Sequence, residues 1–314
     1  MFERMKATTA NRILRHPGGG RDPGLRSAFW IPAAAGMTEH WGWMHEMARC
    51  ILSVLLLLGA LSQAHATDLP ERQADAARKS EAQALVVASD AVRNPNGSFA
   101  VDVLLNEYRA GKLNATSSLT VYSRPSTGSG QYRNLVLFSA PARDVGKLML
   151  RNGIDLWFYD PANRASVRIS PQQRLLGQAS NGDVMTTNLA RDFDAEWVGE
   201  ESLQDGEKRQ RMAVILRLTA QRDDVAYPLV EYWVDPVNKQ PVKANYYTAQ
   251  GRLLKSAWFR RFEETLGAVR PTETVIIDGL NNQWVTIMRN SRYRYQDVPE
   301  AWLQRDYLAR FTGD

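Results

Sequence analysis

The 314-residue sequence carries 39 lysines and arginines against 34 aspartates and glutamates, a formal net charge of +5. Its four histidines and its single cysteine all precede residue 67, and the remaining residues hold 32 basic against 30 acidic side chains. Residues 67–314 therefore exclude Ser-His-Asp and Cys-His catalysis in their usual forms, disulfides, and nearly all zinc and copper sites. The near-neutral balance also argues against a nucleic-acid partner.

Residues 1–46 are rich in Gly, Pro and Arg and show no hydrophobic periodicity, so they are not expected to form a packed core. We interpret them as sequence upstream of the true start, which would be Met44 or Met47. The alternative is a real but disordered extension.

Residues 47–66 have the pattern of a secretory signal peptide. A positive charge precedes an apolar run over residues 50–61, and the segment ends in a small-residue Ala-His-Ala cleavage site. The run is shorter than the roughly 20 residues that span a bilayer. Because Cys50 lies at the start of the run and not at the cleavage point, we expect a soluble periplasmic protein that begins at Thr67, not an acylated one.

An amphipathic helix is expected over residues 71–93, ended by the turn-forming residues 94–97. Apolar, strand-like runs then recur at close to hairpin spacing, separated by Gly, Pro, Asn and Asp. Besides the central hairpin, the predicted strands cover residues 98–108, 112–124, 132–139, 165–170, 193–199, 211–220, 227–235, 240–248, 252–262, 270–278 and 283–295.

The segment Leu148–Pro161 is the clearest local pattern in the chain. Asn152-Gly153 separates two apolar arms and predicts a hairpin with a type I′ turn. On the second arm, Trp157 and Tyr159 share one face of the strand and Leu156 and Phe158 the other. Both faces are apolar, so we expect both to be covered, either by ordinary core packing or with one face lining an apolar cavity.

Two further segments interrupt the strand pattern. Residues 171–190 are rich in Gln, Ser, Asn and Gly, and predict a long connection with one or two short helices. Such a connection is either a lid or binding loop, or a surface excursion packed on a sheet edge. Residues 298–311 predict a C-terminal helix. Together, the pattern favours one strongly curved antiparallel sheet with helices on its concave side.

The motifs, taken in order, resemble the outer membrane lipoprotein-sorting branch of the LolA/LolB-like superfamily of periplasmic lipoprotein carriers. The carrier has a similar hairpin, which here is Gly153 followed by Leu156–Tyr159 and Asp160-Pro161. The likeness covers nearly all of residues 78–311. The sorting-branch pattern is carried by residues 143–147, 168–177, 232–235, 251–255 and 305–311.

This resemblance implies a mainly β (α+β) domain over residues 67–314. Its fold would be a curved antiparallel half-barrel of about eleven strands, with helices covering the concave face over a hydrophobic cavity. The ligand would be a lipid or the acyl chains of a lipoprotein, passed between membranes or to an inner-membrane transporter, with peripheral membrane contact. The alternative is a periplasmic sensor or accessory subunit of an envelope export or stress-signalling system. No cofactor, metal or catalytic residue is expected, and the protein is not expected to be an enzyme.

An apolar cavity suits an acyl chain, because each buried CH₂ contributes about 0.8 kcal/mol. The residues that we expect to line it are Leu148, Leu150, Trp157, Tyr159, Leu175, Leu176, Trp233 and Tyr247, and each of them could instead be plain core. Arg174 is a candidate partner for a headgroup phosphate or carboxylate, although solvated loop arginines are commoner. A carboxylate-only hydrolase is disfavoured, because adjacent acidic residues on a strand point to opposite faces.

Overall fold

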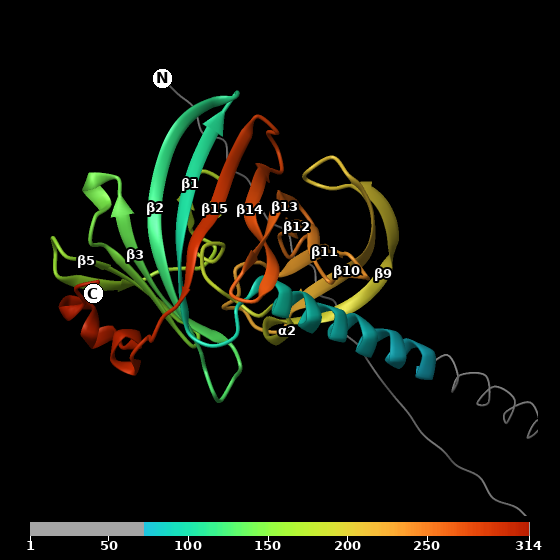
Figure 1. Ribbon diagram of the computed structural model, residues 1–314, viewed down its shortest axis with the longest axis horizontal. Coiled ribbons are helices and arrows are strands. Elements are labelled where there is room, and N and C mark those ends of the chain that lie inside the picture. Colours follow the sequence, from blue (N-terminus) through green and yellow to red (C-terminus); the bar gives the residue numbers. More distant parts are fainter. Residues whose placement is uncertain (1–71, 314) are drawn as a thin grey trace, which may run out of the picture. The chain divides into compact units, whose positions relative to one another are not determined.

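The computed structural model describes residues 72–313, which fall within one compact unit, Ala64–Asp314 (Figure 1). The interpretations of residues 1–46 and 47–66 lie outside the described residues. Within residues 72–313, no helix combines the length and the apolar character that crossing a membrane requires. The helix predicted over residues 71–93 is present over residues 72–93.

Thirteen strands form one sheet in which all neighbours are antiparallel, and two short strands form a separate ribbon, β7–β8. The bounds are β1 Phe99–Arg109, β2 Lys112–Pro125, β3 Tyr132–Ala140, β4 Leu148–Asn152, β5 Asp155–Asp160, β6 Ala165–Arg168, β7 Arg174–Leu176, β8 Ala179–Ser180, β9 Phe193–Gln204, β10 Gln210–Ala220, β11 Leu229–Val234, β12 Pro241–Tyr247, β13 Leu253–Thr265, β14 Ala268–Asp278 and β15 Trp284–Tyr295. The short helices are η1 Ala142–Asp144, α2 Leu189–Asp192, η2 Glu300–Leu303 and η3 Arg305–Arg310.

The sheet consists of two meanders that meet where β1 pairs with β15. One meander runs from β1 to the edge strand β6, and the other from β15 to the edge strand β9. The sheet is curved and open, as Figure 1 shows. The expectation of about eleven strands is wrong, because an open edge accepts further hairpins, whereas closure of a barrel ties the strand number to tilt and shear.

The central hairpin is present, but its turn differs from the predicted one. Asn152 pairs with Asp155, so the two loop residues are Gly153 and Ile154. Gly153 has a φ of +63° and Ile154 is not in the left-handed region, which is the pattern of a type II′ turn. The turn lies one residue later than predicted. It is of type II′ because the β-branched Ile154, now its second central residue, disfavours the positive φ that a type I′ turn would demand there.

Two faces of the sheet carry separate cores. We call the face that carries Phe99, Val101 and Val103 the inner face, and the opposite one the outer face. On the inner face, residues 179–185 of the connection between β6 and β9 pack on strands β1–β5. Further along the same face, Leu85 and Val86 of the N-terminal helix pack on strands β9–β11. The helix and the connection therefore cover the inner face.

The C-terminal segment covers the outer face of β2–β5, beside which it lies in Figure 1. The single helix predicted over residues 298–311 is replaced by two 3₁₀ helices, η2 and η3. Gln304 between them is extended, with φ −112° and ψ 135°. This break allows Leu303 and Leu308, five positions apart, both to be buried on the sheet. The hairpin β4–β5 is thus covered on both sides, as its two apolar faces predict.

Candidate functional site

A cavity of about 170 Å³ lies on the inner face, between strands β1 and β11–β15, the end of the N-terminal helix and the connection before β9. Its apolar wall is formed by side chains that the strand alternation directs inward: Phe99, Val101, Val103, Val230, Ile276 and Met288. Small residues, Ala244 and Ala257, leave room between the larger ones.

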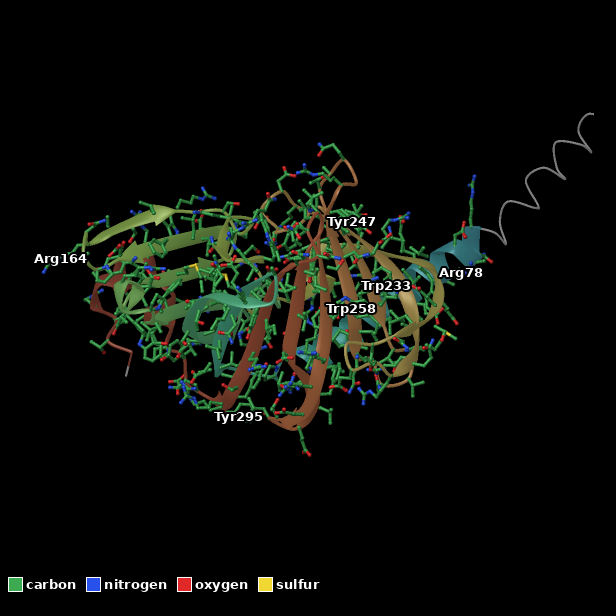
Figure 2. The ribbon with its side chains drawn as sticks, turned by 90° about the horizontal axis from the view of Figure 1, so that it is seen from above. Arg78, Arg164, Trp233, Tyr247, Trp258 and Tyr295 are labelled. Carbon is green, nitrogen blue, oxygen red and sulfur yellow. The ribbon has the colours of Figure 1, made fainter. Side chains whose placement is uncertain are left out.

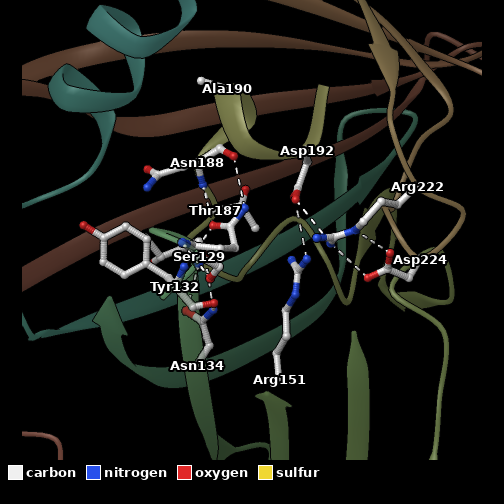
Figure 3. Close-up of polar contacts among 12 residues, drawn as sticks. Ser129, Tyr132, Asn134, Arg151, Thr187, Asn188, Ala190, Asp192, Arg222 and Asp224 are labelled. Atoms are coloured by element: carbon white, nitrogen blue, oxygen red, sulfur yellow. Dashed lines mark hydrogen bonds and ion pairs between the residues drawn. The ribbon is translucent and has the colours of Figure 1, made fainter. Parts of the chain in front are cut away.

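The connection before β9 forms the cover of the cavity and is anchored by amide side chains of β3 and the loop before it. Asn134 donates to the Thr186 carbonyl at 3.0 Å and accepts from its N–H at 3.1 Å. Gln131 contacts Asn188 in the same reciprocal way, at 3.0 and 2.8 Å. Figure 3 shows Asn134, Thr187 and Asn188 in this region. The segment is a cover with one short helix, α2, and its buried Val184 and Met185 argue against a loose surface excursion.

A buried ion pair joins this cover to the sheet. Lys255 of β13, 4% exposed, donates to the Asp183 carboxylate and, at 3.1 Å, to the Gln178 carbonyl. The Tyr227 hydroxyl donates to Asp183 at 3.0 Å. Burial lowers the pKa of Lys255, and the contact with Asp183 partly offsets this effect. Burial likewise raises the pKa of Tyr227 well above its usual value.

A second polar group closes the end of the N-terminal helix against the cavity. Arg93 pairs with Asp90 at 3.3 Å and donates to the Thr187 carbonyl at 3.3 Å. Burial raises the pKa of Asp90, against the effect of Arg93. On the same helix, the hydroxyl of Ser89 forms a hydrogen bond of 2.7 Å with the hydroxyl of Tyr232.

A third group connects the two halves of the sheet at the cavity wall. Asp192, at the end of α2, lies between two guanidinium groups (Figure 3). The Arg151 Nη2 atom is 3.6 Å from Asp192 Oδ2, and the Arg222 Nη2 atom is 3.3 Å from Asp192 Oδ1. Arg222 also forms a bidentate pair with Asp224 at 2.8 and 3.0 Å. Arg151 and Asp192 both line the cavity.

The nine residues proposed from the sequence do not line this cavity. Leu148, Leu150, Trp157 and Tyr159 lie on the outer face, beneath the C-terminal segment. Trp233 also lies on the outer face, where it packs with Trp258 and donates to Glu201 at 2.8 Å; Figure 2 places the two tryptophans close together.

The other predicted residues lie in three further places. Tyr247, labelled in Figure 2, donates a hydrogen bond to Glu231. Leu175 and Leu176, on the β7–β8 ribbon, are half-buried and pack against the inner core beside the cavity. Arg174 is exposed. Contact of any of the nine with a ligand stays a prediction.

The residues that do line the cavity are often immediate neighbours of the predicted ones. Tyr232 and Tyr246 line it, each one position before a predicted residue, and Arg151 follows the predicted Leu150. The same period-two alternation predicts these residues as well, because neighbouring residues of a strand point to opposite faces of the sheet. No sequence pattern predicts that polar residues such as Arg151 and Asp192 line the cavity, because their burial arises only from the packing of the cover.

A family model described only as an uncharacterized protein matches residues 130–310. No curated protein matches. Among solved structures, a LolA superfamily protein from Nitrosomonas europaea is 30% identical, with a TM-score of 0.65, over 72% of this chain and 98% of its own.

Two more distant structures share the fold. A DUF1329 family protein from Desulfovibrio piger is 24% identical with a TM-score of 0.63, covering 74% of this chain and 99% of its own. A putative outer membrane lipoprotein-sorting protein domain from Vibrio parahaemolyticus is 17% identical, also with a TM-score of 0.63, covering 74% and 100%. The fold, the inner-face cavity and the similarity over nearly the whole Nitrosomonas protein agree: this chain belongs to the LolA superfamily.

Proposed function

We propose that this protein is a periplasmic carrier that binds a lipid or a lipidated ligand in the inner-face cavity. It would pass that ligand between membranes or to an inner-membrane transporter. The observation that carries the proposal is the cavity itself: an apolar wall of β-strand side chains under a cover formed by the connection before β9. Membership of the LolA superfamily supports a lipid-carrier role and a periplasmic location at the level of the family.

The energetics of the cover suit reversible binding. Burying an acyl chain gains about 0.8 kcal/mol for each CH₂ group. The amide hydrogen bonds that anchor the cover at Asn134 and Gln131 each contribute only about 1 kcal/mol net. A chain that buries several CH₂ groups therefore gains enough free energy to displace parts of the cover. No covalent chemistry is required for loading or release.

The test is native mass spectrometry with lipid extraction on the protein purified from a bacterial periplasm. Wild-type protein should carry acyl species. Ala257→Phe places a ring in the cavity and should lose them, whereas Ala213→Phe enlarges a buried alanine of the outer face and should keep them. Trp157→Ala, on the outer face, tests the sequence-based site separately: loss of acyl species from this folded variant would place the ligand on that face.

Overpacking a core alanine costs typically 1–3 kcal/mol, so thermal unfolding must first establish that each variant folds. Absence of acyl species from the wild type, in both the native mass and the extract, would contradict the proposal. An unchanged lipid load in folded Ala257→Phe would contradict the cavity as its site. The sensor or accessory-subunit alternative stays a prediction, favoured if a lipid-free protein captures a membrane partner.

A further inference from the structure

Arg151 is the one cavity-lining arginine on the N-terminal half of the sheet among residues 72–313. It follows Leu150 on β4, so its side chain points to the inner face, opposite to that leucine. Only 7% of the residue is exposed. A full charge is therefore placed at the wall of an apolar cavity, where a charged group is costly unless it is paired and hydrogen-bonded.

The Arg151 guanidinium lacks such bonds. A guanidinium has five N–H donors, and the side chain of Arg151 makes no hydrogen bond within residues 72–313. Its ion-pair partner there, Asp192, is 3.6 Å away, too far for a hydrogen bond. The Arg151 Nη2 atom and the Asp192 Oδ1 atom are both buried without a hydrogen-bond partner.

The other cations of the cavity are bonded. Lys255 donates to Asp183 and the Gln178 carbonyl, and Arg93 donates to Asp90 and the Thr187 carbonyl. Unmet donors are therefore a property of Arg151 and not of the cavity as a whole. Buried polar groups without partners are rare in folded proteins, and a functional role is one of their recognised explanations.

We propose that Arg151 binds the anionic headgroup, a phosphate or a carboxylate, of an amphiphile whose acyl chain occupies the apolar part of the cavity. This inference rests on the proposed function and adds the charge of the ligand to it. The planar guanidinium matches both oxyanions bidentately. Arg222, on the other side of Asp192, supplies a second positive charge from the solvent side.

Asp192 competes with such a headgroup. Its carboxylate faces both arginines, close enough to pair with their charges but without satisfying the donors of Arg151. Asp192→Asn removes this internal anion while keeping the shape of the side chain. Asp192→Asn and Arg151→Gln should therefore shift the affinity for an anionic ligand in opposite directions.

The experiment is isothermal titration calorimetry on the full chain, below the critical micelle concentrations of the ligands. The probes share one chain length: laurate, dodecyl phosphate and the neutral 1-monolauroylglycerol, with inorganic phosphate as a chain-free anion. Arg151→Gln should weaken binding of the anionic amphiphiles by about tenfold to a hundredfold and leave the neutral one unchanged. Asp192→Asn should tighten the anionic amphiphiles, and Arg151→Lys should fall between wild type and Arg151→Gln.

Arg133→Gln is the matched control, because Arg133 lies on the neighbouring strand β3 and pairs with Glu300 of the C-terminal segment. It should leave all four affinities unchanged. If Arg151→Gln does not fold, Asp192→Asn and Arg151→Lys carry the same comparison. The ratio of laurate to dodecyl phosphate affinity then identifies the headgroup.

Three outcomes would count against the inference, and they can be told apart. Equal affinities for neutral and anionic amphiphiles, independent of Arg151, would overturn the headgroup site and leave the carrier proposal intact. Arg151-dependent binding of inorganic phosphate as tight as that of dodecyl phosphate would reassign the site to a free anion. Failure of every amphiphile to bind wild-type protein would overturn the carrier proposal itself.

Discussion

The Glu273 carboxylate of β14 is buried on the outer face and receives three arginines. Arg260 and Arg289 donate hydrogen bonds to it, and Arg261 lies 3.4 Å away. Its side chain is 0% exposed. Burial opposes its ionisation, but the hydrogen bonds from Arg289 and Arg260 outweigh burial and lower its pKa below the usual 4.5. The negative charge of Glu273 therefore offsets the mutual repulsion of three arginines that lie close together.

Glu273→Gln should lower the free energy of unfolding at pH 7 by about 3 kcal/mol, because it leaves the arginines around a neutral buried group. A lowered folded-state pKa contributes stability that is present above pH 4.5 and is lost as the pH falls through that lowered pKa. The variant should lack this part of the acid dependence. Urea unfolding at pH 7 and at about pH 3 measures it.

Glu264→Gln, an exposed carboxylate at the end of the preceding strand, is the control and should change stability by no more than about 0.5 kcal/mol. A Glu273→Gln variant with the acid dependence of the wild type would contradict the assignment.

At the scale of elements, the C-terminal segment completes the outer core. Trp302 packs edge-on against Tyr122 at 5.4 Å and against Phe311 at 4.9 Å between ring centroids. Leu303 and Leu308 are 0% and 2% exposed. The segment is short and built of two 3₁₀ helices, whose hydrogen bonds alone are weak. Side-chain burial is therefore what holds it on the sheet.

Leu303→Ala should destabilise the protein by about 3 kcal/mol, the loss expected when a buried leucine is truncated and a cavity is left. Because Leu303 lies on the outer face, the ligand load should stay that of the wild type. Thermal unfolding and native mass spectrometry check the two expectations. Leu280→Ala, at a site 83% exposed, should change neither. Loss of ligand from folded Leu303→Ala would show that the two faces are coupled.

At the scale of the whole molecule, the cavity gathers tyrosines from β11, β12, β15 and the loop before β11. Tyr227, Tyr232, Tyr246 and Tyr293 line it, and burial raises the pKa of each. For Tyr293 the pKa rises to about 12. The folded state thus keeps these phenols neutral in a pH range where the unfolded chain, with its pKa of about 10, ionises them.

The protein should therefore lose stability above about pH 10, by about 1.4 kcal/mol per pH unit for each tyrosine that stays protonated only in the folded state. Stability from neutral phenols is present below the unfolded pKa and disappears as the pH approaches the raised one. Denaturant unfolding between about pH 9 and 12 tests this slope. Tyr293→Phe should reduce it, whereas Tyr295→Phe, at an exposed site on the same strand, should not. A flat profile would contradict the expectation.

Much of the local structure was determined by the sequence alone. Period-two alternation and turn residues located nearly every strand, the central hairpin and its two apolar faces, because these features depend on neighbouring residues. The motifs also identified the superfamily. Local errors arose where packing set the backbone: the turn at Gly153-Ile154 and the split of the C-terminal helix at Gln304.

Only the tertiary structure decided which face is the inner one. Alternation divides residues into two faces, but it cannot say which face receives the helix and the cover. That choice depends on contacts between distant residues, such as Asn134 with Thr186 or Leu85 with β10. The apolar character of Trp157 and Trp233 directed the sequence-based prediction to the outer face, since a well-packed outer core is as apolar as a cavity. The place of Arg151 in the site also depends on distant contacts. Its partner Asp192 comes from α2, far from β4 in the sequence, so the residues beside Arg151 in the chain do not predict it.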